Sequence, residues 1–419
     1  MAAARPGSPA VSEPDASIPE VAASGGPSAG SLREVLGASL RLGLTSFGGP
    51  IAHLGYFRHE YVQRRRWLDE ATYADLVALC QFLPGPASSQ LGIAIGTRRA
   101  GMLGGLVSWL GFTLPSAVAL VLFGLFTASV DLSTAGWVHG LKLAAVAVVA
   151  QAIWAMSRTL TPDWPRRGVA LVAAAVALAW TTAIFQVAII AAGALAGRFL
   201  LRPPAAAADG PEASPVSRRV GILALTAFVV LLLGLPLMRA ADGQPVALFE
   251  SFYRAGSLVF GGGHVVLPLL HTSVVDPGWV TGDQFLAGYG AAQAVPGPLF
   301  TFAAYLGTVS LVSPNGVAGA AIALVAIFLP SFLLIFGALP FWDWLRGAVG
   351  FRRALAGTNA AVFGILFAAL YTPIWTSAVK APTDVAIAGA ALGLLVTGRI
   401  PPIVVVGLTA LAGQLTARG

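Results

Sequence analysis

The chain has 419 residues, of which 57% are hydrophobic and only 10% charged, and its formal net charge is +7. With a mean hydropathy of +0.80, this composition excludes an ordinary soluble protein and indicates a membrane protein with many spans. The basic residues are mostly arginines in loops between apolar segments, as the positive-inside rule predicts, so we expect no nucleic acid partner. A single Cys80 excludes a disulfide framework or a thiolate metal site.

The first part of the chain predicts a tail and two short hairpins. Residues 1–30, rich in Ala, Pro, Ser and Gly, predict a disordered tail without a cleavable signal peptide. Residues 31–66 contain two helix-like runs around Gly48-Gly49-Pro50, and residues 69–98 contain two more around Pro84-Gly85-Pro86. The helix expected from Glu70, with Asp69 as its N-cap, measures roughly 21 Å and cannot span a bilayer. We therefore expect two helical hairpins that enter and leave from the same side.

Nine full spans are expected after these hairpins and their counterparts. Four follow in the first half, over residues 102–128, 138–157, 168–183 and 184–200. One lies alone at 220–237, inside a polar linker at 203–246. Four more follow in the second half, over residues 315–338, 354–371, 384–398 and 401–416. The last pair in each half is short for a hydrocarbon core of about 30 Å.

The second half of the chain repeats the first. Phe47-Gly48-Gly49, Trp67 and Gln81-Phe-Leu-Pro84-Gly85-Pro86 recur in order as Phe260-Gly261-Gly262, Trp279 and Gln293-Ala-Val-Pro296-Gly297-Pro298. Leu114-Pro115-Ser116 recurs as Leu329-Pro330-Ser331, and Gly140 matches Gly357. We therefore divide the chain into a first unit at 31–202, the linker, and a second unit at 247–419.

The arginines indicate that the two units face opposite ways. Arg58 and Arg64–Arg66 follow the first Gly-Gly motif, whereas the corresponding stretch Leu270–Gln284 has no Lys or Arg. The contrast reverses in the next pair of corresponding loops. Ala128–His139 has no Lys or Arg, whereas Phe341–Arg353 has several arginines. The unpaired span at 220–237 would invert the second unit. The expected fold is an all-α polytopic membrane protein built as an inverted-topology repeat with broken, re-entrant hairpins.

The two Pro-Gly-Pro breaks are the strongest candidates for a binding site. Broken helices at membrane depth must be buried or line a wet cavity, and the helix that restarts at Ser88 points free N–H groups inward. Converging helix N-termini form a site for an oxyanion, with Gln81 and Gln293 as amide donors. Taken singly, each break would be read as a packing kink; paired in inverted units, they favour a site. The candidate binding residues here are Gln81, Pro84, Gly85, Pro86, Ser88, Gln293, Pro296, Gly297 and Pro298.

A second group of candidates lies near the Gly-Gly motifs. The candidate glycines are Gly48, Gly49, Gly261 and Gly262, which by themselves would also suit close helix packing. Arg41 and Arg254 each lie six residues before the Phe of a Gly-Gly motif. Each arginine could bind the anion within the membrane, or its side chain could snorkel to the membrane interface. We interpret His53 and His264 as structural, and leave Lys142 open between an anion countercharge and a helix-end anchor. No catalytic or metal-ligating pattern, phosphate-binding loop or nucleotide fingerprint appears, so we expect no enzyme and no cofactor.

These paired motifs resemble the chromate ion transporter family in its long, two-unit form. The resemblance rests on Phe47-Gly-Gly-Pro, Trp67 with Tyr73, Trp279 with Phe285, and both Gln-x-x-Pro-Gly-Pro motifs, and it covers both units. It implies export of chromate from a bacterial cytoplasm, with chromate resistance as the result and sulfate as a structural analogue.

The expected function is a secondary transporter of a divalent tetrahedral oxyanion, chromate first, in a multi-pass protein of the bacterial plasma membrane. The alternatives are a transporter of another oxyanion such as sulfate, or an anion channel. The expected partners are that oxyanion and the lipid bilayer, and a homodimer is left open. A membrane enzyme is disfavoured because no acid–base or metal cluster appears.

Overall fold

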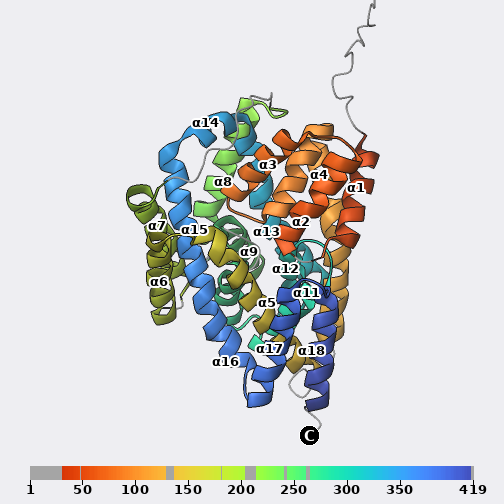
Figure 1. Cartoon of the computed structure of the whole chain (residues 1–419). Helices are drawn as coiled ribbons and strands as arrows, with labels where there is room; N and C mark the ends of the chain where they lie inside the picture. The colour runs from red at the N-terminus through yellow and green to blue at the C-terminus, as the bar shows by residue number, and fades with distance from the viewer. Residues whose placement is uncertain are drawn as a thin grey trace, which may run out of the picture.

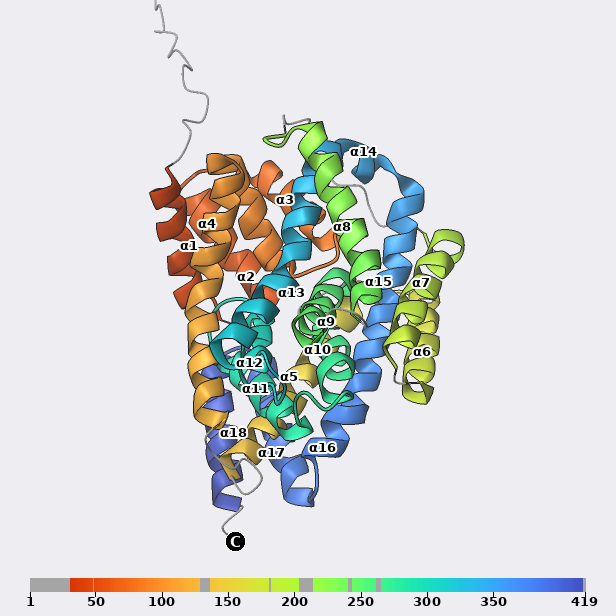
Figure 2. The same ribbon diagram turned by 180° about the vertical axis from the view of Figure 1, so that it is seen from behind.

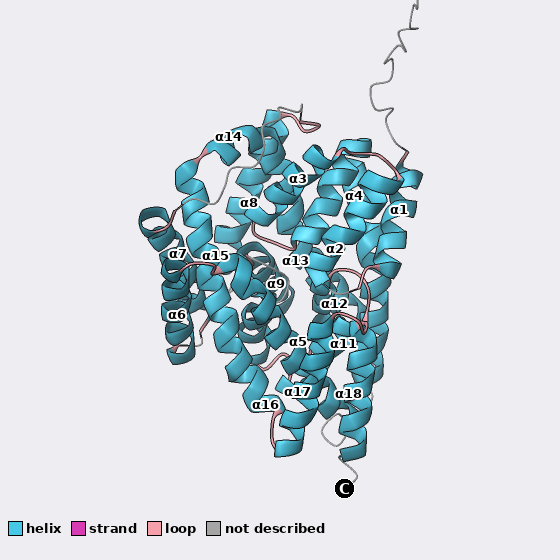
Figure 3. Cartoon of the chain, in the orientation of Figure 1, coloured by secondary structure: helices cyan, strands magenta, loops and turns pink. Residues whose placement is uncertain are grey.

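The computed structural model describes residues 31–47, 49–128, 136–180, 182–202, 214–239, 243–260 and 265–416. The predicted tail at 1–30, the loop at 129–135, linker residues 203–213, Gly48, and the motif residues Gly261, Gly262 and His264 lie outside these residues. Every regular element in the described residues is a helix (Figure 3). The all-α prediction is therefore confirmed.

The helices follow the predicted segments closely. The first unit contains α1 (Leu32–Thr45), α2 (Gly49–Phe57), a π-helical turn (Arg58–Arg64), α3 (Glu70–Phe82), α4 (Ala87–Ala128), α5 (Gly136–Leu160), α6 (Trp164–Ala179) and α7 (Ala183–Leu200). The linker helix is α8 (Arg218–Met238). The second unit contains α9 (Gln244–Leu258), α10 (Val266–Leu270), α11 (Gly282–Ala294), α12 (Phe302–Thr308), α13 (Gly316–Ala338), α14 (Trp342–Gly347), α15 (Val349–Ala369), α16 (Thr376–Ala378), α17 (Pro382–Thr397) and α18 (Pro402–Thr416).

In the described residues, five stretches of helix are long and apolar enough to cross a membrane, and they include α4, α5, α8, α13 and α15. These correspond to five of the nine predicted spans. The other four are α6, α7, α17 and α18, with 16, 18, 16 and 15 residues. At 1.5 Å per residue each of these is shorter than the hydrocarbon core of about 30 Å. The chain is thus polytopic, with two short hairpins beside its long spans.

Contacts at one end of the first unit confirm its hairpins. Glu34, in the first turn of α1, accepts a hydrogen bond from the indole Nε1 of Trp67 at 3.1 Å. The same carboxylate lies 3.2 Å from Arg99 and 4.0 Å from Arg65. The start of the first hairpin, at Glu34, therefore lies beside the end of the first hairpin and beside the end of the second. Each hairpin must then return to the side where it began.

α4 is two helices joined by a tight turn. Ala100 and Gly101 have non-helical backbone angles, and Gly101 has φ of +66°. Beyond the turn the chain folds back, so that Gly96 lies against the backbone of Gly104. The prediction that a span begins at residue 102 agrees with this turn. The first arm returns from the Pro-Gly-Pro break, and the second arm is the long span.

The two halves of the chain exchange their last hairpins. α6 and α7 of the first unit pack against α15 of the second, whereas α17 and α18 of the second pack against α5 of the first. Figures 1 and 2 show these hairpins beside α15 and α5, with α8 on the outside of the bundle. Gly357 on α15 lies against Gly193 and Gly197 of α7, and Gly140 on α5 lies against Thr409 and Gly413 of α18.

Candidate functional site

The first Pro-Gly-Pro break is held by the opposite half of the chain. α3 ends at Phe82 and α4 begins at Ala87, and Gly85 between them has φ of +125°, a conformation that favours glycine. The Gly85 N–H donates to the Val259 carbonyl at 2.6 Å. The Pro84 carbonyl accepts from Gln90 Nε2, also at 2.6 Å. We call this contact between the first break and the end of α9 the first junction.

The second break makes the reciprocal contact. α11 ends at Ala294, and Gly297 has φ of +97°. The Gly297 N–H donates to the Ser46 carbonyl at 2.9 Å. The Pro298 carbonyl accepts from the Thr301 hydroxyl at 2.8 Å, in the 3₁₀ turn that leads into α12. We call this contact between the second break and the end of α1 the second junction.

The two junctions use equivalent residues. Ser46 and Val259 each end a helix one residue before the Phe of a Gly-Gly motif. The Leu-Pro-Ser motifs also take equivalent places: a Cβ atom added at Gly85 would lie 3.1 Å from Ser331 Oγ, and one added at Gly297 would lie 2.8 Å from Ser116 Oγ. Each break is therefore bound by one helix end and flanked by one serine of the opposite half.

A cavity of about 40 Å³ lies at the second junction. Three of the predicted site residues line it together: Gly49, Gln293 and Gly297. Gln151 of α5 also lines it and donates to the Leu395 carbonyl at 3.1 Å. The amide nitrogen of Gln293 is buried without a hydrogen bond to any described residue. The structure thus brings Gly49 of one Gly-Gly motif and the opposite Pro-Gly-Pro break around one space with a free N–H donor.

Further unpaired donors lie on the segments that form the junctions. Within the described residues, these buried groups have no hydrogen-bond partner: the hydroxyls of Ser46, Ser89, Thr113 and Ser331 and the indole N–H of Trp109. Trp109 and Thr113 precede Ser116 on α4, and Trp109 packs on Phe328 of α13 with ring centroids 5.6 Å apart. Buried polar groups are normally paired, so a concentration of neutral donors indicates a place for a polar ligand.

Sequence analysis predicted only part of this set of junction residues. It found Ser88, which is buried, together with the prolines Pro84, Pro86, Pro296 and Pro298 that flank the break glycines. It did not single out Trp109 or Thr113, because a Trp or Thr in an apolar helix carries no spacing signal. It noticed the Leu-Pro-Ser repeat without assigning it a role. Gly48, Gly261 and Gly262 lie outside the described residues.

Three predicted residues lie apart from the junction contacts. Arg41 is exposed on α1, on a face shared with the exposed Leu40 and Leu44, away from the buried face of Ala38 and Leu42. Gln81 is exposed near the end of α3. Arg254 binds a carboxylate that sequence reasoning overlooked.

That carboxylate is Glu250, one turn before Arg254 on α9. Its side chain is only 2% exposed, and it lies 3.1 Å from Arg254 Nε and 2.9 Å from Arg239 Nη1. Glu and Arg four residues apart on a helix are the signal that could have found the pair. If Arg254 moved away to bind an anion, the buried Glu250 carboxylate would lose one of its partners, which is unfavourable. Arg254 therefore stays paired with Glu250 on its own helix. The one carboxylate is thus shared by two guanidinium groups, and the cluster keeps a net positive charge.

An ion pair and a hydrogen bond join α5 to the second unit. Lys142 Nζ lies 2.6 Å from Asp283 in the first turn of α11, and His139 Nε2 lies 2.7 Å from Asp384 of α17. Lys142, which the sequence left open, therefore has an acidic partner. Among the described residues, no three His, Cys, Asp or Glu side chains gather as metal ligands.

Comparisons with known proteins identify the family of this chain. The sequence model of the chromate transporter family matches residues 33–198 and 246–414. The chain belongs to the chromate transporter family. The transporter is 29% identical to the chromate transport protein of Pseudomonas aeruginosa over 90% of both chains. It is 31% identical to the probable chromate transport protein of Synechococcus elongatus, over 73% of this chain and 75% of that one. It is 27% identical to the chromate transport protein of Cupriavidus metallidurans, over 84% and 85%. No solved structure matches it.

Proposed function

We propose that this transporter exports chromate from the cytoplasm of a bacterium across its plasma membrane and thereby confers chromate resistance. The observation that carries the proposal is the reciprocal pair of junctions, in which Gly85 binds Val259 and Gly297 binds Ser46. Each junction joins the two halves by one backbone hydrogen bond beside a helix break. A movement of one half against the other would change both junctions together, which is what alternating access requires.

The division into two inverted units stays a proposal with several supports. The family match falls in two stretches, 33–198 and 246–414, which nearly coincide with the units 31–202 and 247–419 and lie on either side of α8. Helices at equivalent places in the two units have equivalent neighbours. α5 packs against α17 and α18, and α15 packs against α6 and α7. The arginine contrast between the corresponding loops supports opposite orientation. An unpaired helix such as α8 supplies the inversion.

The chemistry of the junctions suits a tetrahedral oxyanion. Hydroxyl, indole and amide groups donate hydrogen bonds without adding charge, and helices begin directly after both breaks. We propose Gly49, Gln293, Gly297, Ser46, Gly85, Ser88 and Ser331 as residues of the binding path. Neutral donors hold a dianion less tightly than fixed arginines would, which favours release on the far side. We leave Arg254 out of the path because its guanidinium is engaged by Glu250, which Arg239 shares.

Transport in everted membrane vesicles tests the proposal. Vesicles that contain the transporter should take up chromate faster than vesicles without it, with a rate that saturates and is inhibited by sulfate. Counterflow of chromate would distinguish a carrier from a channel, and collapsing the membrane potential or the pH gradient separately would reveal the driving ion. Absence of any protein-dependent chromate uptake would overturn the proposed function.

Orientation is tested by labelling single cysteines. Gln63 and Asp276 are exposed at corresponding places in the two units, whereas Ser273 nearby is buried and unsuitable. In a background with Cys80→Ala, Gln63→Cys should react with an impermeant thiol reagent only from the cytoplasmic side. Asp276→Cys should react only from the outside. Labelling of both cysteines from the same face would mean parallel units and would remove the basis for inversion.

A further inference from the structure

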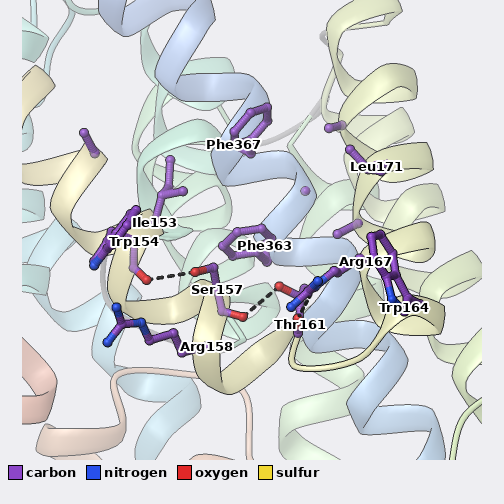
Figure 4. A pocket seen from close by; sticks show the side chains of 14 residues that line it. Ile153, Trp154, Ser157, Arg158, Thr161, Trp164, Arg167, Leu171, Phe363 and Phe367 are labelled. Carbon is purple, nitrogen blue, oxygen red and sulfur yellow. Dashed lines mark hydrogen bonds between the residues drawn. The ribbon is translucent and has the colours of Figure 1, made fainter.

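A second cavity lies where α5, α6 and α15 meet. Its volume is about 460 Å³, and Figure 4 shows the side chains around it. The lining residues come from the last part of α5 and the next residue, Thr161, from the first part of α6, and from Phe363 to Phe367 of α15. The proposed chromate path uses none of these residues.

Most of the cavity wall is apolar and opens to the outside of the bundle. Ile153, Leu171, Phe363 and Phe367 supply much of the lining. Leu171 is 65% exposed and Phe367 is 49% exposed, so the wall continues onto the outer surface. In a membrane protein such a surface faces lipid, and an acyl chain is the natural occupant of an apolar space of this size.

The lining also carries positive charge. Arg158 lies over the ring of Trp154 at 5.4 Å, and Arg167 lies over the ring of Trp164 at 5.1 Å. Arg167 also donates to the Thr161 carbonyl at 3.2 Å. No carboxylate lines the cavity, and Asp163, between the two arginines in the chain, caps α6 and lies 3.6 Å from Arg166. The charge on the two arginines is thus not neutralised by a lining residue.

Arginines beside tryptophans at the end of apolar helices mark a membrane interface, and positive residues concentrate on its cytoplasmic side. Basic pockets between helices on that side bind anionic lipid headgroups. A free inorganic anion would engage the arginines but would leave the apolar wall uncovered. The charge and the wall together therefore require a ligand with an anionic head and a hydrocarbon chain.

We propose that this cavity binds one phospholipid with an anionic headgroup. Arg158 and Arg167 hold the phosphate, Trp154 and Trp164 flank it at the interface, and an acyl chain lies along Ile153, Phe363 and Phe367. The lipid bridges α5 and α15, the two helices that carry the exchanged hairpins, and it contacts α6 directly. It therefore stabilises the packing of the two halves without touching the junctions.

The test compares two lipids that differ only in headgroup charge. The full chain is purified in detergent with equal amounts of dioleoylphosphatidylglycerol and dioleoylphosphatidylcholine, and the retained lipid is quantified by mass spectrometry. We expect phosphatidylglycerol to be retained about thirtyfold over phosphatidylcholine, as two basic side chains near a lipid surface predict. Phosphatidylglycerol should also raise the melting temperature more than phosphatidylcholine does.

Two double variants separate the site from general surface charge. R158Q/R167Q should lose the headgroup preference, while R158K/R167K should keep most of it. R218Q/R219Q removes the same charge from the exposed start of α8 and should behave as the unmodified protein. Equal retention of both lipids by the unmodified protein, or equal loss in the α8 control, would overturn the proposal. Inorganic phosphate that stabilises the protein as much as phosphatidylglycerol would identify a free-anion site instead.

Discussion

Gly85→Leu and Gly297→Leu should each reduce chromate transport to the background of empty vesicles while leaving the protein in the membrane. Both glycines have positive φ, at +125° and +97°, where a leucine is strained. A Cβ atom at Gly85 would lie 2.5 Å from Gln90 Nε2, and one at Gly297 would lie 2.8 Å from Ser116 Oγ. The side chain would therefore displace the groups that form each junction. Vesicle uptake at equal protein levels measures the effect.

Gly37→Leu and Gly389→Leu are matched controls for these variants. Both glycines lie in helices, α1 and α17, and a Cβ atom at either would meet nothing within 4 Å. These proteins should transport chromate nearly as fast as the unmodified one. If Gly85→Leu and Gly297→Leu also retained near-normal uptake, the breaks would be packing kinks with no role in the transport path.

Gly140→Leu and Gly357→Leu should destabilise the transporter by about 3 kcal/mol or more, because overpacking against a rigid backbone cannot be relieved by side-chain movement. A Cβ atom at Gly140 would lie 2.6 Å from Ala410 Cα of α18, and one at Gly357 would lie 2.5 Å from Gly197 Cα of α7. Both substitutions separate a long helix from the hairpin of the other half. The melting temperature and the size-exclusion profile in detergent measure the loss.

Gly393→Leu on α17 serves as the comparison, since it lies on the same exchanged hairpin and faces open space. Its melting temperature should stay close to that of the unmodified protein. Unchanged melting of both Gly140→Leu and Gly357→Leu would mean that the hairpins do not pack on the opposite half. The exchange of hairpins between the two halves would then be wrong.

Features that depend on nearby residues were predictable from the sequence. Asp69, the predicted N-cap, accepts from the Thr72 N–H at 2.7 Å, and Thr281 and Gln284 form a capping box at the start of α11. The Pro-Gly-Pro breaks fall where proline removes backbone donors and glycine permits positive φ. Caps, breaks and apolar runs are local effects, since their energies depend on residues within one or two turns.

Contacts between distant parts of the chain could be decided only by the tertiary structure. The pairing of Gly85 with Val259 and of Gly297 with Ser46 depends on how the two halves cross, as does the exchange of α6–α7 and α17–α18. Arg41 and Arg254 occupy equivalent sequence positions, yet Arg41 is exposed and Arg254 is bound to Glu250. Their different surroundings come from partners elsewhere in the fold, Arg239 among them. Long-range packing assigns these partners, because helix periodicity specifies which face is buried but not which helix buries it.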